Sequence, residues 1–167
     1  WDEQPDPYLT ERHTNEIFPL LRKRYLFAEV NDFLLYDFYT PEGGVNEDVF
    51  ALSNRSGEER ALVIYHNKFA TARGWIRSSA AFSVKNESGD RVLAQRTLGE
   101  GLGVDRRENV FCIFRDQISG REYIRNTRDI HQQGLYIELE AYKNHVFVDF
   151  RQVQDNEWRQ YANLAAY

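Results

Sequence analysis

The segment Val49-Phe-Ala-Leu-Ser-Asn54 and the segment Arg60-Ala-Leu-Val-Ile-Tyr-His-Asn67 decide the fold class. Both are rich in β-branched and aromatic residues, and the polar turn Arg55-Ser-Gly-Glu-Glu59 separates them, as in a β-hairpin. In the second segment, residues 61, 63 and 65 alternate with residues 62, 64 and 66, and both sets are mostly apolar. We therefore expect this strand to be central in a sheet and covered on both faces.

Further strands are predicted on both sides of this hairpin. Each is a short apolar or alternating run that ends at a turn signal such as Pro41-Glu-Gly-Gly44. Short strands at turn-punctuated intervals favour a mainly β fold, and we expect an antiparallel β-sandwich of the Greek-key type with an N-terminal and a C-terminal helix. The predicted runs are 33–39, 75–85, 91–98, 110–115, 122–125, 135–140 and 145–151.

The two ends of the chain are predicted to be helical. Residues 14–28 show helical spacing behind a possible N-cap at Thr14, whereas the proline-containing residues 1–13 are expected to be extended. Asp155 is expected to cap a C-terminal helix. The predicted organisation is an N-terminal extended segment with a helix that ends a preceding barrel domain, an antiparallel β-sandwich domain, and a C-terminal helix that continues in a parent protein: 1–30, 31–152 and 153–167.

Composition limits the classes of function. The chain has 167 residues, of which 42% are hydrophobic, and this is enough for a single core. The net charge of −5 is spread along the chain, and no apolar run approaches the roughly 20 residues of a membrane helix. We therefore expect neither a nucleic-acid nor a membrane partner. The single cysteine, Cys112, excludes an internal disulfide, which favours a cytoplasmic location, although a secreted bacterial protein can be equally poor in cysteine.

No sequence pattern of a catalytic or metal site stands out. A Gly-x-Ser-x-Gly elbow and histidines at metal-ligand spacing are absent, so we expect no catalytic residue, metal or cofactor. The glycine-rich segment 99–109 leads into a strand, and a flexible connection is favoured over a phosphate loop. His66 and Cys112 lie in apolar strands; Cys112 is expected to be buried and inert, and His66 is expected to be a core or edge residue.

Aromatic residues remain as candidates for ligand binding. Their rigid apolar faces can stack on the C–H faces of sugar rings, although burial in a core is the commoner fate of each ring. The candidate carbohydrate-binding residues are Trp75, Trp158, Tyr39 and Tyr123, with Tyr65 and Tyr136 as further aromatic residues that can offer a flat face.

A helix that ends in Leu-Leu-Arg-Lys-Arg-Tyr25 is followed by Asn31-Asp-Phe-Leu-Leu-Tyr-Asp-Phe38, and then by the segments 48–55 and 59–67. This series resembles the junction between the last barrel helix and the C-terminal β-domain in the α-amylase family of glycoside hydrolases, family thirteen. The segment 136–147 is similar to the closing strands of that domain, with Ala141 in place of the usual proline. Residues 68–134 are longer than the usual connection, and residues 149–167 continue past the usual end.

The resemblance implies a function as well as a fold. It implies a non-catalytic C-terminal accessory or stabilising domain of an α-amylase-like glycosidase or glucanotransferase that acts on α-glucans. The catalytic motifs of that family stand on barrel strands and are absent here, so the resemblance assigns no catalytic residue to this chain. The expected partner is the catalytic barrel domain of the same parent chain, with α-glucan as a further ligand.

Two alternatives to the accessory domain stay open. One is a carbohydrate-binding module that uses exposed aromatic residues, and the other is a self-sufficient small β-protein that binds another ligand. Both ends of the chain are interpreted as cuts in a longer protein, because the last residues continue an apolar helical face without a stop signal. We therefore expect the isolated chain to self-associate.

Overall fold

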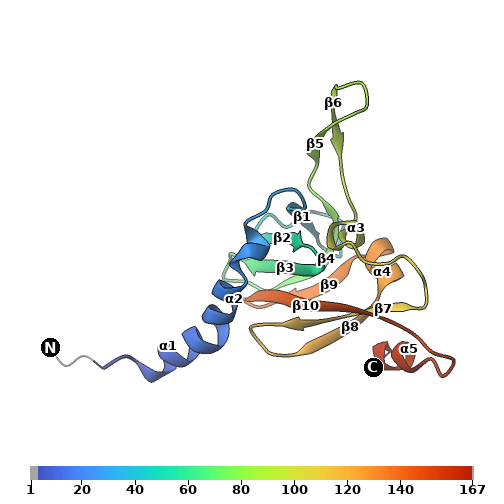
Figure 1. Ribbon diagram of the computed structural model, residues 1–167. Helices are drawn as coiled ribbons and strands as arrows, with labels where there is room; N and C mark the ends of the chain where they lie inside the picture. The colour runs from blue at the N-terminus through green and yellow to red at the C-terminus, as the bar shows by residue number, and fades with distance from the viewer. Residues whose placement is uncertain (1–3, 167) are drawn as a thin grey trace.

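The computed structural model describes residues 4–166, and eight of its strands form one curled antiparallel sheet (Figure 1). The strands of this sheet are β1 (Leu34–Tyr39), β2 (Val49–Ser56), β3 (Glu59–His66), β4 (Ala72–Ser79), β7 (Val110–Asp116), β8 (Glu122–Asn126), β9 (Leu135–Leu139) and β10 (Asn144–Gln154). Their order across the sheet is β8-β7-β10-β3-β2-β1-β4-β9, and all neighbouring strands are antiparallel.

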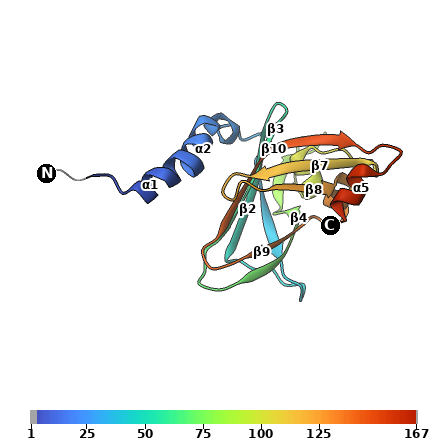
Figure 2. The ribbon, with the colours of Figure 1, turned by 90° about the horizontal axis from the view of Figure 1, so that it is seen from below.

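The predicted mainly β, antiparallel fold is confirmed, whereas a Greek-key sandwich is not. The fourth strand lies beside the first, and the order β3-β2-β1-β4 is that of a Greek key. All eight strands nevertheless belong to one hydrogen-bonded sheet, and Figure 2 shows how this sheet curls. Residues of both end strands, β8 and β9, line the same small cavity of about 170 Å³. The curl thus brings the two ends of the sheet toward each other around one core.

The inner face of the curl holds the main core. Along β1, Leu34, Tyr36 and Phe38 are buried and Leu35 is exposed, which is the alternation of a strand with one face in a core. β3 lies between β2 and β10 at the centre of the sheet, and its inward Leu62 and Ile64 are fully buried.

A helical segment, residues 7–27, covers the outer face of β3 and β10 with its later part, whereas its first helix extends away from the sheet (Figures 1 and 2). The segment consists of α1 (Pro7–Arg12), a π-helical turn η1 (His13–Ile17), α2 (Phe18–Arg22) and a 3₁₀ turn η2 (Arg24–Phe27). From this segment Leu20 and Leu26 pack against Ala61 and Val63 of β3 and against Val146 and Val148 of β10. The predicted covering of β3 on both faces is therefore confirmed where the helical segment crosses it.

The helix begins earlier than residues 14–28 predicted. The Asp6 side chain accepts the backbone N–H of Tyr8, and Pro7 occupies the first turn, where a helix needs no N–H donor. The expected extended conformation of residues 1–13 is thus wrong from Pro7 onward, and residues 1–3 lie outside the described residues. Pro19 is accommodated in the first turn of α2, directly after the π-helical turn.

The predicted strand 75–85 is two strands. β4 ends at Ser79, and the chain leaves the sheet after Ala80, whose N–H still donates to the carbonyl oxygen of Leu35 in β1. The following β5 (Phe82–Lys85) pairs with β6 (Arg91–Ala94) alone, and this hairpin projects away from the curled sheet (Figure 1).

The glycine-rich segment 99–109, expected to be flexible, begins within a short helix, α3 (Leu98–Leu102). Thr97 and Glu100 form a capping box, in which the Thr97 hydroxyl accepts the N–H of Glu100 and the Glu100 carboxylate accepts the N–H of Thr97. Gly103 then ends the helix in the left-handed conformation, with a φ of 59°. The Thr-x-x-Glu spacing is a helix signal that the sequence prediction did not use.

The two remaining helices are short, and α4 (Thr127–Gln132) follows β8 directly. Asp155 caps α5 (Gln160–Ala165), because its carboxylate accepts the N–H groups of Tyr161 and Ala162. Trp158 lies before α5 rather than on its apolar face.

Candidate functional site

Two of the four predicted carbohydrate-binding residues lie on adjacent strands of the outer face. Tyr39 of β1 pairs in register with Trp75 of β4, and Trp75 pairs with Tyr136 of β9. The neighbouring Phe38 and Ile76 are fully buried, so alternation directs these three aromatic side chains outward. We call Tyr39, Trp75 and Tyr136 the aromatic row. The ring centroids of Trp75 and Tyr136 are 4.9 Å apart, with a tilt of 60° between the ring planes.

Two glycines allow the strands beneath the aromatic row to approach each other closely. Gly74 in β4 faces inward, and a Cβ atom there would overlap the carbonyl oxygen of Tyr39. Gly134 precedes β9 with a φ of 79°, and a Cβ atom there would overlap the carbonyl oxygen of Ile76. A side chain at either position would push neighbouring strands apart, so both glycines help to position the aromatic row.

Polar groups surround the aromatic row. The Arg77 guanidinium lies over the Trp75 ring, 5.0 Å from its centroid. The Tyr136 hydroxyl donates a hydrogen bond of 2.7 Å to Glu138, and Arg73 pairs in register with Glu138 on the same outer face. The bond to Glu138 raises the pKa of Tyr136, because an ionised phenolate would face a carboxylate.

The other two predicted carbohydrate-binding residues lie elsewhere. Tyr123 of β8 is half-buried against the main core, where its ring stacks on Phe114 at 5.8 Å and meets Phe147 edge-on at 5.5 Å. Trp158 is 83% exposed, and no aromatic contact joins it to another ring within residues 4–166. The structure therefore brings together Tyr39 and Trp75, adds Tyr136, and separates Tyr123 and Trp158 from them.

A second exposed surface lies on the outer face of the first three strands. Leu35 pairs with Leu52 across β1 and β2, and Phe50 pairs with Tyr65 across β2 and β3. We call these four residues the outer apolar face. Leu35 is 53% exposed and Phe50 is 54% exposed, so the helical segment does not cover them. A contiguous apolar surface of this kind is typical of an interaction site.

The helical segment also carries apolar side chains that point away from the sheet. Leu20 and Leu26 face the sheet, whereas other large apolar residues of the segment are exposed. The segment is therefore apolar on two sides, unlike a surface helix with a single buried stripe. We call the second set the exposed helix side, and its members are Leu9, Ile17, Phe18, Leu21 and Phe27.

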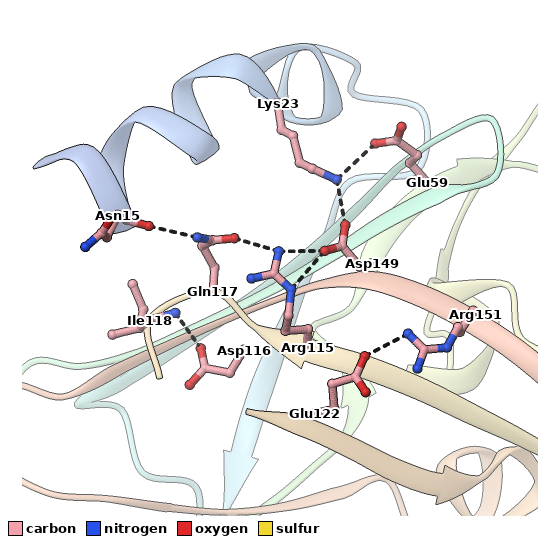
Figure 3. A network of polar contacts seen from close by, with 10 residues as sticks. All are labelled: Asn15, Lys23, Glu59, Arg115, Asp116, Gln117, Ile118, Glu122, Asp149 and Arg151. Atoms are coloured by element: carbon pink, nitrogen blue, oxygen red, sulfur yellow. Dashed lines mark hydrogen bonds and ion pairs between the residues drawn. The ribbon is translucent and has the colours of Figure 1, made fainter. Parts of the chain in front are cut away.

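A polar network fixes the helical segment to the sheet (Figure 3). Lys23 donates to the Asp149 carboxylate at 2.8 Å, and Arg115 donates to the same carboxylate at 2.6 Å. The Gln117 side chain accepts from Arg115 at 3.0 Å and donates to the backbone carbonyl of Asn15 at 2.9 Å. The network thus joins β7 and β10 to two turns of the helical segment.

Asp149 occupies a β-bulge in β10. The pairing of β10 with β7 shifts between Val148 and Arg151, and Asp149 adopts a φ of 56°, a conformation that aspartate tolerates better than most residues. Burial raises the pKa of Asp149, but the hydrogen bonds from Lys23 and Arg115 outweigh this effect and lower it. The carboxylate is therefore held ionised by the network.

A cleft of about 840 Å³ beside the turn after β7 contains aspartate, serine and histidine. The buried Asp116 carboxylate contacts the Ser119 hydroxyl at 2.7 Å and the His145 ring at 3.0 Å. Burial raises the pKa of Asp116, but the hydrogen bonds from His145, Ser119 and the backbone outweigh it and lower the pKa to about 2. Serine and histidine meet the same aspartate oxygen rather than each other, so this cluster holds the turn and lacks the nucleophile–base pair of a hydrolase.

The structure also shows where Cys112 and His66 lie, the two residues that the sequence places in apolar strands. Cys112 is buried, and burial raises the pKa of its thiol to about 12. His66 is buried as well, with its ring 3.0 Å from the carbonyl oxygen of Glu140. The predicted burial of Cys112 is confirmed, and of the two positions expected for His66 the structure shows the core. Within residues 4–166, no group of three or more histidine, cysteine or acidic side chains could hold a metal ion, and no helix has the length and apolarity to cross a membrane.

The chain was compared with known proteins by sequence. No model of a protein family matches it, and no curated protein matches it.

Proposed function

We propose that this chain is a non-catalytic accessory domain that packs against the catalytic barrel of an α-amylase-like enzyme acting on α-glucans. The resemblance of residues 20–25, 31–38 and 48–67 to the junction between barrel and β-domain supplies the family. The exposed helix side is the structural observation that supports the proposal. The helical segment packs against the sheet with Leu20 and Leu26, whereas the exposed helix side is apolar and accessible to solvent. The segment then serves both domains, as the last barrel helix and as a cover for β3 and β10.

The energetics of burial favour this arrangement. A large apolar side chain contributes about 1.5–3 kcal/mol when it is fully buried. Leu9, Phe18 and Leu21 are each about half exposed, so covering these three would contribute about 2–4 kcal/mol. The outer apolar face, with Leu35 and Phe50, would add to this interface if the barrel reached across the sheet.

The proposal includes the Greek-key β-sandwich that the resemblance implies for such a domain. The strand order β3-β2-β1-β4 supports it, because a fourth strand beside the first is the Greek-key connection. The cavity shared by β8 and β9 supports it too, because the two halves of a curled sheet then face each other as the layers of a sandwich do.

Self-association tests the exposed helix side. The wild-type chain is expected to associate with rising concentration in sedimentation equilibrium, because its bare apolar surface has no barrel to cover it. The triple variant Leu9→Ser, Phe18→Ser, Leu21→Ser is expected to be monomeric with an unchanged thermal midpoint. Leu93→Ser is the matched control, since Leu93 is strongly exposed on the projecting hairpin. A wild-type chain that stays monomeric at high concentration contradicts the role of this surface.

Two further observations test the enzyme family. The coding sequence upstream of this segment is expected to encode, in frame, a barrel that carries the catalytic residues. The purified chain itself is expected to release no sugar from starch or maltooligosaccharides. An upstream sequence without a barrel, or hydrolysis by the chain alone, would refute the proposal.

A carbohydrate-binding module is the second candidate function. The specific observation that favours it is the aromatic row, which brings together Tyr39 and Trp75 from separate parts of the sequence.

A further inference from the structure

A cleft of about 1190 Å³ opens between α4, α5 and the strands β7 and β8. Four arginines from four separate segments line it: Arg107 before β7, Arg125 in β8, Arg128 in α4 and Arg159 before α5. The residues that α5 contributes to the lining are alanines, whose small side chains leave the arginines room. The fold therefore gathers positive charge from distant parts of the sequence at a place with space for a ligand.

The cleft also holds three acidic side chains, and two of them already have partners. Glu108 pairs with Arg128 at 2.9 Å. Both carboxylate oxygens of Asp155 accept backbone N–H groups of α5. Asp129, in the first turn of α4, is the third acidic residue. One acidic side chain thus remains to balance the other three arginines of the cleft.

Two of these arginines have no carboxylate partner. Arg125 and Arg159 form no ion pair within residues 4–166, whereas Arg107 pairs with Asp105 at 2.8 Å. The Arg125 guanidinium donates to the backbone carbonyl of its neighbour Ile124 at 2.7 Å, which uses one of its five N–H groups. Both guanidinium groups therefore retain donors for a ligand in the cleft.

Arg159 also has a backbone conformation that is unfavourable for arginine. Its φ of 50° and ψ of 40° lie in the left-handed region, which glycine and asparagine occupy far more readily. Backbone strain of this kind clusters at sites that hold ligands. The position thus carries an arginine although a glycine would suit the turn before α5 better.

We propose that this cleft binds an oxyanion, the phosphate or carboxylate group of a small molecule, through Arg125 and Arg159. A guanidinium is planar and donates two parallel hydrogen bonds to such a group, which the point charge of a lysine does not match. Arg107 and Arg128 border the same cleft and are held in place by their own carboxylate partners. The site involves neither the exposed helix side nor the aromatic row, so it is independent of the proposed function.

Titration calorimetry of the whole chain with pyrophosphate and with citrate tests the site, in a buffer whose NaCl content keeps the ionic strength constant. At least one of the two anions is expected to bind with a Kd below about 1 mM, and the tighter one identifies phosphate or carboxylate as the preferred group. Arg125→Gln and Arg159→Gln are each expected to weaken that binding by about tenfold. If neither anion binds at millimolar concentration, or if both variants bind as the wild type does, the proposal is wrong.

Arg159→Gly separates binding from folding. It is expected to weaken anion binding as Arg159→Gln does, with a thermal midpoint equal to or above that of the wild type, because glycine accepts the positive φ. A lower thermal midpoint with unchanged anion binding would assign Arg159 to the fold and overturn its role in the site.

Arg91→Gln is the matched control, because Arg91 is exposed on the projecting hairpin and lies outside the cleft. This variant removes the same charge and is expected to bind the anion as the wild type does. A loss of binding as large as that in Arg125→Gln would show an effect of net charge alone and would overturn the location of the site.

Discussion

Asp149 offers the sharpest test of how the helical segment is held on the sheet. Its carboxylate accepts from Lys23 and Arg115, and its side chain is 37% exposed. Ion pairs with this degree of exposure are screened by solvent and contribute about 0.5–1 kcal/mol each. Removal of the charge in Asp149→Asn should therefore lower the free energy of unfolding by about 1–2 kcal/mol.

Asp149→Ala should lower the free energy of unfolding more than Asp149→Asn does, although both variants remove the charge. The φ of 56° at this bulge is tolerated by asparagine but costs alanine about 1 kcal/mol more. The total loss for alanine is then about 2–3 kcal/mol, and the thermal midpoint of a chain of this length should fall by about 5–10 °C. Urea unfolding followed by circular dichroism measures both variants against the wild type.

High salt separates the contribution of the ion pairs from that of the backbone strain at residue 149. In 1 M NaCl the Debye length falls to about 3 Å, so the difference between wild type and Asp149→Asn should shrink. The difference between the asparagine and alanine variants should persist, because backbone strain does not respond to ionic strength. Glu122→Gln is the control, since its ion pair with Arg151 joins β8 to β10 and leaves the helical segment untouched. Equal stabilities for the asparagine and alanine variants would refute this account of the bulge.

Three further predictions concern stability. Gly134→Ala should lower the free energy of unfolding by about 2–3 kcal/mol, because φ is positive and a Cβ atom would overlap the carbonyl oxygen of Ile76. Gly57→Ala is the control, since φ is positive there too but the space is open, and it should lower the free energy of unfolding by about 1 kcal/mol. Urea unfolding measures both variants. Thr97→Ala should remove the capping box of α3 and cost about 1 kcal/mol, and a thermal midpoint equal to the wild type would contradict the cap. Asp116 has a lowered pKa of about 2, so its contribution is complete above the unfolded pKa of about 3.9 and is lost as pH falls toward 2. The free energy of unfolding of the wild type should exceed that of Asp116→Asn by about 2 kcal/mol at pH 7. This difference should disappear between pH 4 and pH 2 when unfolding is measured at falling pH.

Part of the candidate site could be predicted from the sequence. Trp75 and Tyr39 were candidate sugar platforms on the ground of residue type alone, and no pattern in the sequence linked either of them to Tyr136. Their juxtaposition requires that β4 insert between β1 and β9, two strands that are distant in the sequence. The close approach permitted by Gly74 and Gly134 makes this pairing possible, and a glycine within or before a strand was the one local signal for it.

The sequence by itself determined the elements whose pattern is local. The alternation in 33–39 and 135–140, and the hairpin of 49–67, follow from side chains that point to opposite faces at every second residue. Only the tertiary structure decided which face is inner. The bulge at Asp149 shifts the alternation in β10, so that Val148 packs under the helical segment while Phe150 stacks on Phe114 in the main core at 5.1 Å. Simple alternation predicts one face for Val148 and Phe150, and it fails because a bulge is stabilised by partners that the local sequence does not contain, Lys23 and Arg115.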